Sequence, residues 1–189
     1  IVVDAGHGGD DPGKIGINDA LEKDINLQIA LKLQKLLEQN NIKVVMTRDT
    51  DQGLYSDGAT NKKAEDMQTR CKIIEDSDAL FTVSIHQNSY TSPEIQGAQV
   101  FYYGQSENGK KLAETLQSAL IEQVDPDNHR EAKANESYYL LKKTPTPTVI
   151  VECGFLSNPA EAELLLQEEY QDKLVNAIYS GIETYLGSL

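Results

Sequence analysis

The segment VVDAGHGG at residues 2–9 joins an apolar, strand-like run to a glycine-rich turn that carries His7. Two later segments have the same design: the apolar run of FTVSIHQNS leads to His86, and that of TVIVECGF leads to Glu152. In open sheets of parallel strands, functional groups gather beyond the carboxyl ends of the strands. We therefore expect these three side chains to emerge at one edge. The glycines beside His7 permit positive φ and let the backbone approach a ligand.

Short apolar runs alternate along the chain with longer segments of helical period. The predicted helices cover residues 20–39, 64–76, 107–123 and 159–186, the last as one or two helices. This order predicts an α/β fold in which a mostly parallel sheet is flanked by helices on both faces. GAQVFYY at 97–103 follows the preceding strand with no helix between them, which predicts an antiparallel strand. The polar stretches 48–63 and 124–137 are predicted to be surface loops.

Length and charge limit the classes of function. The 189 residues predict one domain over residues 1–189, and 17 basic against 30 acidic residues give a net charge of −13. Without a run of lysines and arginines, we expect no binding of nucleic acid and no contact of this domain with a membrane. Residue 1 already lies in a strand-like run, so we expect an export or anchor segment upstream. Two cysteines are too few for a disulfide framework.

Glu22 lies at the start of a predicted helix rather than at the end of a strand. Apolar residues follow it at offsets 3, 7, 11 and 14, which is the stripe that packs on the sheet. Glu22 therefore heads a buried face, where a carboxylate needs an ion pair, hydrogen bonds or a metal. Asp19 and Glu22 also fit an N-cap residue and its reciprocal partner, so a capping role stays open.

The other candidates have structural alternatives as well. His86 could be a hydrogen-bonded histidine of the core, and Glu152 a buried carboxylate with an ordinary partner. His129 lies in a polar segment typical of a solvated loop, and Cys153 is expected to face away from Glu152 because side chains alternate along a strand. A catalytic zinc requires three protein ligands, an open fourth position and a nearby base. The chain offers one such set of residues: His7, Glu22, His86 and Glu152.

Four segments that extend over the whole chain resemble the zinc-dependent N-acetylmuramoyl-L-alanine amidases, the family called amidase 3: VVDAGHGGDDPG, LEKDINL, SIHQNS and VECGFLSNPAE. The resemblance implies a mixed six-stranded sheet surrounded by helices. It also implies His7, Glu22 and His86 as ligands of Zn2+ and Glu152 as the catalytic carboxylate. The implied reaction is hydrolysis of the amide that joins the lactyl group of N-acetylmuramic acid to L-alanine in peptidoglycan.

Three further segments resemble the germination-specific amidases of spore-forming bacteria: NKKAEDMQTRCKII, GAQVFYY and YYLLKK. Those enzymes trim cortex peptidoglycan so that muramic δ-lactam can form. The cell-separation amidases of the family carry an additional helix over the zinc after the strand equivalent to QVFYY. Here the next predicted helix follows Tyr103 almost at once, so no self-blocking helix is expected and an external activator protein stays open. The substrate implies an extracytoplasmic location, secreted or membrane-anchored, in the cortex region of the developing spore.

Other functions of a wall-directed protein stay open. One is a vegetative cell-wall amidase, and another is a zinc carboxypeptidase that acts on stem peptides. A carboxypeptidase requires an arginine placed for the terminal carboxylate, and the sequence does not place Arg48, Arg70 or Arg130 there. A non-catalytic wall-binding domain is the third alternative, and Glu152 argues against it because simple binding needs no base. Asn88 and Gln99 lie near the predicted active edge as candidates for substrate contact.

Overall fold

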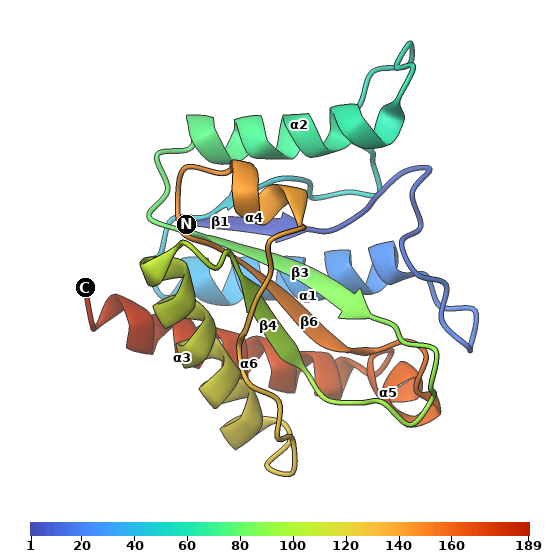
Figure 1. The fold of residues 1–189 in the computed structure, drawn as a ribbon, viewed down its shortest axis with the longest axis vertical. Coiled ribbons are helices and arrows are strands. Elements are labelled where there is room, and N and C mark those ends of the chain that lie inside the picture. Colours follow the sequence, from blue (N-terminus) through green and yellow to red (C-terminus); the bar gives the residue numbers. More distant parts are fainter.

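The computed structural model describes residues 1–189 and has a central sheet with helices on both sides (Figure 1). The strands are β1 (Val2–Ala5), β2 (Val45–Met46), β3 (Thr82–Asn88), β4 (Gln99–Tyr102), β5 (Lys133–Ala134) and β6 (Thr148–Phe155). The helices are α1 (Glu22–Gln39), α2 (Lys62–Asp76), α3 (Glu107–Gln123), α4 (Tyr139–Lys143), α5 (Pro159–Leu164) and α6 (Glu168–Leu186). The predicted α/β class is confirmed.

The six strands lie in the order β2-β1-β3-β6-β4-β5. The first four are parallel, and β4 pairs antiparallel with β6, as the sequence predicts. The edge strand β5 pairs parallel with β4 through Lys133 and Ala134. These residues lie in the stretch 124–137, so the prediction that this whole stretch is a loop is wrong. A strand of two residues is too short to produce an apolar alternation that a sequence pattern could reveal.

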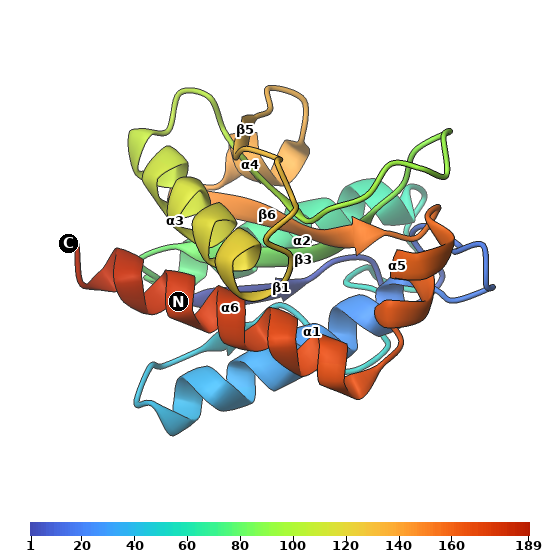
Figure 2. The ribbon, with the colours of Figure 1, turned by 90° about the horizontal axis from the view of Figure 1, so that it is seen from below.

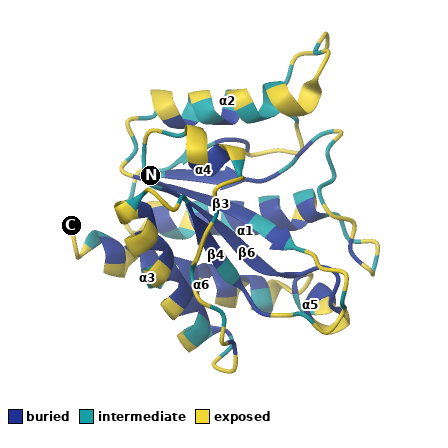
Figure 3. Cartoon of the chain, in the orientation of Figure 1, coloured by how far each residue is buried: buried dark blue, intermediate teal, exposed yellow.

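Alternating side chains give the sheet two different faces. Val3, Val83 and Val151 belong to a cluster of 30 buried hydrophobic residues that includes the inner sides of α1, α3 and α6. Val2 and Ile150 point the other way, into two smaller clusters shared with α2 and α4. Figure 2 shows α1 and α6 on one side of the strands and α2 and α4 on the other. The inner strands β1, β3, β4 and β6 are buried along most of their length (Figure 3).

The face toward α2 and α4 also carries the polar side chains of the inner strands. Asp4 lies on β1, Ser84 and His86 lie on β3, and Glu152 lies on β6. Cys153, the residue after Glu152, is fully buried in the large cluster on the opposite face, as strand alternation predicts. The sheet therefore separates an apolar core on one side from a polar site on the other. None of the helices combines the length and the apolar character required to traverse a membrane.

Candidate functional site

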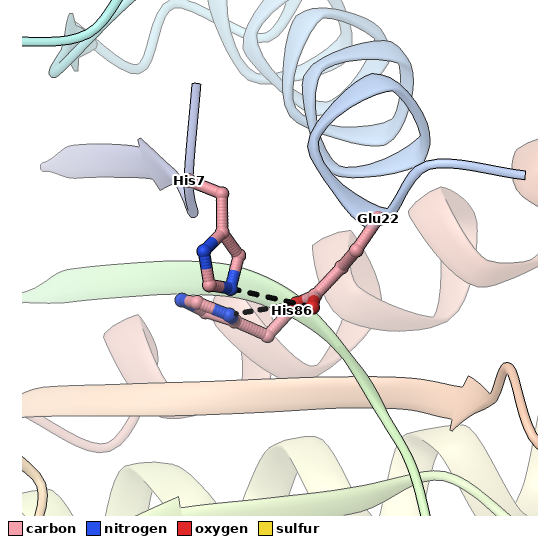
Figure 4. Close-up of side chains that lie close together, drawn as sticks. All are labelled: His7, Glu22 and His86. Atoms are coloured by element: carbon pink, nitrogen blue, oxygen red, sulfur yellow. Dashed lines mark hydrogen bonds and ion pairs between the residues drawn. The ribbon is translucent and has the colours of Figure 1, made fainter. Parts of the chain in front are cut away.

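The site candidates lie together at the carboxyl edge of the parallel strands. His7 follows β1, His86 lies near the end of β3, and Glu152 on β6 is the register partner of His86. Glu22 is the first residue of α1, and its carboxylate points toward both imidazole rings (Figure 4). Four residues from four separate segments of the chain thus meet at the edge that the strand ends predict.

The Glu22 carboxylate contacts both imidazole rings. Its Oε2 lies 3.3 Å from His7 Nε2, and its Oε1 lies 3.0 Å from His86 Nδ1. One candidate ligand atom from each of the three side chains lies within 4.8 Å of the other two. Leu21 is the N-cap residue of α1 and makes no side-chain cap bond, while Glu22 is only 4% exposed. The alternative in which Asp19 and Glu22 cap the helix is therefore wrong.

Two glycines permit the close approach of these side chains. A Cβ atom at Gly6 would lie 2.3 Å from the His86 ring, and one at Gly13 would lie 2.6 Å from Glu22 Oε2. Gly13 also has a φ of +67°, in the left-handed region that other residues adopt at a cost. The glycine-rich character of this turn is thus a requirement of the site, because any side chain here would displace a candidate ligand.

Neighbouring groups fix the orientation of the two side chains nearest the turn. Asp11 Oδ2 lies 2.9 Å from His7 Nδ1, which leaves Nε2 of that ring directed at Glu22. The backbone N–H groups of Lys14 and Gln87 donate to the two Glu22 carboxylate oxygens at 2.7 and 3.1 Å. Partners of this kind hold metal ligands in place and tune their basicity.

The contacts within the cluster shift the pKa values of His7 and Glu22 in opposite directions. Burial lowers the pKa of His7, but the hydrogen bond and charge of Glu22, and then those of Asp11, raise it to about 9. Burial would raise the pKa of Glu22, yet the hydrogen bonds to His7 and His86 hold it well below its usual range. A metal cation here would replace the ring proton of His7, because only the neutral imidazole can coordinate.

Glu152 is a carboxylate with few partners. It is 7% exposed, and its Oε2 makes no hydrogen bond. Burial raises its pKa to about 7, an effect that the charge of His86 opposes and the charge of Glu22 reinforces. A carboxyl group whose pKa lies near neutrality can both accept and return a proton. Glu152 therefore has the properties of a general base, and its environment differs from that of Glu22.

All four candidates line a pocket of about 590 Å³. Because the His86 side chain is 22% exposed and faces this pocket, the alternative of a core histidine is wrong. Asn88 also lines the pocket, whereas the Gln99 side chain contacts Glu131 and Arg130 instead. His129 is exposed and lies outside the pocket, as a loop residue should.

Several pocket residues were not indicated by the sequence as site residues. They come from α2 and from the segment at the start of α4: Lys63, Asp66, Arg70, Tyr138 and Tyr139. No strand end or glycine-rich turn marks these positions. Their place in the pocket follows from the packing of α2 and α4 on the polar face of the sheet, which local periodicity does not reveal.

The donor set of the cluster suits zinc. Two imidazole nitrogens and one carboxylate oxygen form a known ligand set of catalytic zinc, which leaves the fourth position for water or substrate. His7, Glu22 and His86 could hold such an ion on the side of the pocket where Glu152 also lies. Glu152 is not part of the ligand cluster, so its carboxylate is free for proton transfer.

Comparison with known proteins identifies the family. The model of the Amidase_3 family, N-acetylmuramoyl-L-alanine amidase, matches residues 1–184. The chain belongs to this family. It is an N-acetylmuramoyl-L-alanine amidase, a hydrolase of peptidoglycan, and the resemblance seen in the sequence is confirmed.

The relatives of this amidase include other N-acetylmuramoyl-L-alanine amidases. The germination-specific N-acetylmuramoyl-L-alanine amidase of Bacillus subtilis (strain 168) is 39% identical over 188 residues, which cover 98% of this chain and 78% of that protein. N-acetylmuramoyl-L-alanine amidase LytC of the same organism is 32% identical over 98% of this chain, but only 35% of LytC is covered. The structure of the CwlD amidase from Clostridioides difficile, in complex with the GerS lipoprotein, matches with a TM-score of 0.96 and 42% identity over 100% of this chain and 98% of that chain.

A short connection joins β4 to α3 at the sheet edge opposite the site, because Tyr102 pairs with Val149 near the start of β6. β4 ends at Tyr102 and α3 begins at Glu107, with a turn closed by the Ser106 N–H, which donates to the Tyr103 carbonyl. No helix lies between these two elements.

Proposed function

We propose that residues 1–189 form a single zinc-dependent catalytic domain that cleaves the amide between N-acetylmuramic acid and L-alanine in spore cortex peptidoglycan. In this proposal His7, Glu22 and His86 hold the zinc, and Glu152 is the catalytic base. One observation carries the assignment. Three groups of zinc-ligand type converge within 4.8 Å, while Glu152, beside His86 on the neighbouring strand, keeps a carboxylate oxygen with no partner.

The chemistry divides between the metal and Glu152. When bound, zinc supplies a Lewis acid that lowers the pKa of a water molecule and stabilises negative charge on the carbonyl oxygen. Glu152 accepts the proton of the attacking water and then donates it to the L-alanine nitrogen as the carbon–nitrogen bond breaks. A pKa of about 7 suits both steps, because the group changes its protonation state readily near neutral pH. Glu22 remains a ligand throughout.

The spore cortex is favoured as the site of action by the name and similarity of the Bacillus subtilis relative. On this proposal the domain acts outside the cytoplasm, and its product carries peptide-free N-acetylmuramic acid residues, the precursors of muramic δ-lactam. A vegetative cell-wall role remains the alternative, because relatives of this chain include a probable cell wall amidase. Because the related CwlD amidase was solved in complex with a lipoprotein, we also propose an external protein activator for this chain.

The arginines give no support to the carboxypeptidase alternative. The guanidinium groups of Arg48 and Arg70 are 2% exposed and donate to backbone carbonyls and buried carboxylates. Arg130 donates to the Gln96 carbonyl and stacks over Phe155. Arg48 and Arg70 are thus engaged inside the protein, and Arg130 does not line the pocket of the candidate site. A carboxypeptidase would require an arginine in the pocket that is free to bind the terminal carboxylate of a stem peptide.

The reaction can be tested by its product. Purified peptidoglycan is digested with the zinc-loaded protein, and the new amino groups are labelled and identified by mass spectrometry, with Glu152→Ala as the inactive control. We expect L-alanine to carry the new amino terminus. Release of single amino acids from the carboxyl end of the stem, without a new L-alanine terminus, would contradict the proposal.

The cortex role needs a separate test in spores. The chain, with an export signal, is expressed in a spore-forming strain that lacks its own cortex amidase, and cortex muropeptides are analysed. We expect muramic δ-lactam and germination to return. Restoration of vegetative wall turnover without δ-lactam would favour the vegetative alternative.

A further inference from the structure

The backbone that leads from β1 into the site is held by two buried arginines. Arg48 donates from Nε to the Ala5 carbonyl at 2.9 Å and from Nη2 to the Gly6 carbonyl at 3.0 Å. Arg70 donates from Nη1 to the Ala5 carbonyl at 2.7 Å and from Nη2 to the His7 carbonyl at 2.6 Å. Three consecutive carbonyl groups, the last that of a candidate zinc ligand, thus accept hydrogen bonds from guanidinium groups.

The conformation of His7 explains why such support is needed. Its φ is +62°, in the left-handed region that non-glycine residues rarely adopt and that persists only where surrounding contacts fix it. Glycines flank it on both sides and offer little resistance to rotation of the backbone. Asp11 contacts Nδ1 of the His7 ring, and Arg70 donates a hydrogen bond to the His7 main-chain carbonyl. The direction of the ring toward Glu22 depends on both contacts.

Arg70 is itself anchored by two carboxylates. Its Nε donates to Asp66 Oδ2 at 2.6 Å, and its Nη1 donates to Asp4 Oδ1 at 2.6 Å. Asp4 also accepts hydrogen bonds from Thr47 and Ser84, so it cannot move away from the arginine without losing them. Burial lowers the pKa of Arg70, but the charges of Asp4 and Asp66 outweigh burial and raise it. The guanidinium of this α2 residue therefore stays charged and fixed in place.

We propose that Arg70 is a positioning residue for the metal site: its planar fork fixes the backbone of His7 and so places the imidazole for zinc. This inference rests on the proposed role of His7 as a ligand. The alternative is that Arg70 merely neutralises the buried charge of Asp4. A lysine would keep the positive charge, but its single ammonium cannot make the same set of directed contacts with Asp4, Asp66, Ala5 and His7.

The test compares Arg70→Lys with Thr47→Val. The valine variant removes one hydrogen bond to Asp4 at 2.7 Å and leaves the contacts of His7 intact. For each variant, zinc affinity is measured by competition with a chelator, and the visible absorption of bound Co2+ reports the ligand geometry. Thermal unfolding of the metal-free protein reports the effect on the fold alone.

We expect Arg70→Lys to weaken zinc binding about 10- to 100-fold, the usual effect of removing a residue that holds a metal ligand in place. The Co2+ spectrum should change as well, because the His7 ring is no longer fixed. Thr47→Val should lower thermal stability while the zinc dissociation constant stays within about threefold of the wild type, because the His7 contacts are intact. Equal zinc affinities in Arg70→Lys and the wild type would overturn the proposal. Equal weakening in both variants would assign the effect to Asp4 instead.

A second variant keeps the proposal testable if Arg70→Lys does not fold. Asp66→Ala removes the anchor at Nε but leaves the buried pair of Arg70 with Asp4. We expect a smaller but measurable loss of zinc affinity, and an unchanged affinity would contradict the inference. Wild-type protein and His7→Ala are measured beside these variants. If the wild type itself binds no zinc, the proposed function fails; if it binds zinc and the Arg70 and Asp66 variants bind it equally well, only the role of Arg70 fails.

Discussion

His86 and Glu152 are direct register partners on the adjacent parallel strands β3 and β6. Both side chains therefore lie on the polar face of the sheet, at the same distance along the strands. One of them belongs to the cluster of candidate ligands, and the other stays outside it with an unpaired oxygen. The sheet itself thus sets the spacing between the proposed metal and the proposed base, and no loop movement is needed to bring them together.

The buried negative charge of Glu152 should destabilise the folded protein above neutral pH, and a neutral side chain at this position should remove that cost. Its pKa of about 7 in the folded protein lies above its ordinary value of 4.5, so between these values the folded state holds a proton that the unfolded state has lost. The free energy of unfolding therefore falls as pH rises through this window, by roughly 3 kcal/mol in total. We expect metal-free Glu152→Gln to match the wild type near pH 4.5 and to exceed it by up to that amount above pH 8. Urea unfolding at both pH values checks this, and a difference that does not change with pH would contradict it.

Zinc binding should release a proton from His7. The pKa of about 9 means that this ring is protonated at neutral pH in the metal-free protein, and coordination requires the neutral form. Affinity for zinc should therefore rise by about tenfold for each pH unit between pH 6 and 8 through this one group. Calorimetry in two buffers of different ionisation enthalpy measures the released protons directly. A binding enthalpy that is the same in both buffers would show that His7 is already neutral.

A methyl group at Gly13 should damage the site. Its Cβ would lie 2.6 Å from Glu22 Oε2, and its φ of +67° adds backbone strain of about 1–3 kcal/mol. We expect Gly13→Ala to lower both the free energy of unfolding and the affinity for zinc. Gly58→Ala is the matched control, because a Cβ there meets nothing within 4 Å and should leave both quantities unchanged. Equal behaviour of the two variants in unfolding and zinc titration would argue against a steric role for Gly13.

The sequence predicted those features of the site that local patterns encode. The apolar runs before His86 and Glu152 indicated strands, and strands that run parallel must deliver their carboxyl ends to one edge. The stripe that follows Glu22 along α1 predicted its burial, which the structure has at 4% exposure. The glycines around His7 indicated close backbone approach, and the clash distances at Gly6 and Gly13 give the physical reason.

Other features depend on contacts between distant segments and have no local signature. Arg48 and Arg70 lie in polar segments that resemble solvated surfaces, yet both side chains are buried against the turn at residues 5–7. The edge strand β5 has two residues and lacks a periodic pattern. Tyr138 enters the pocket because the start of α4 packs on the sheet through Phe101. Each of these placements is decided by tertiary packing.

The central claim is that His7, Glu22 and His86 bind zinc while Glu152 transfers the proton. The most direct test measures zinc content and muropeptide hydrolysis on the same preparations of Glu152→Gln and His86→Ala. The account predicts that Glu152→Gln retains a full complement of zinc while hydrolysis falls by about 10²- to 10⁴-fold, the usual contribution of a general acid–base group. It predicts that His86→Ala loses both the zinc and the activity. Near-normal hydrolysis by Glu152→Gln, or full zinc retention by His86→Ala, would contradict it.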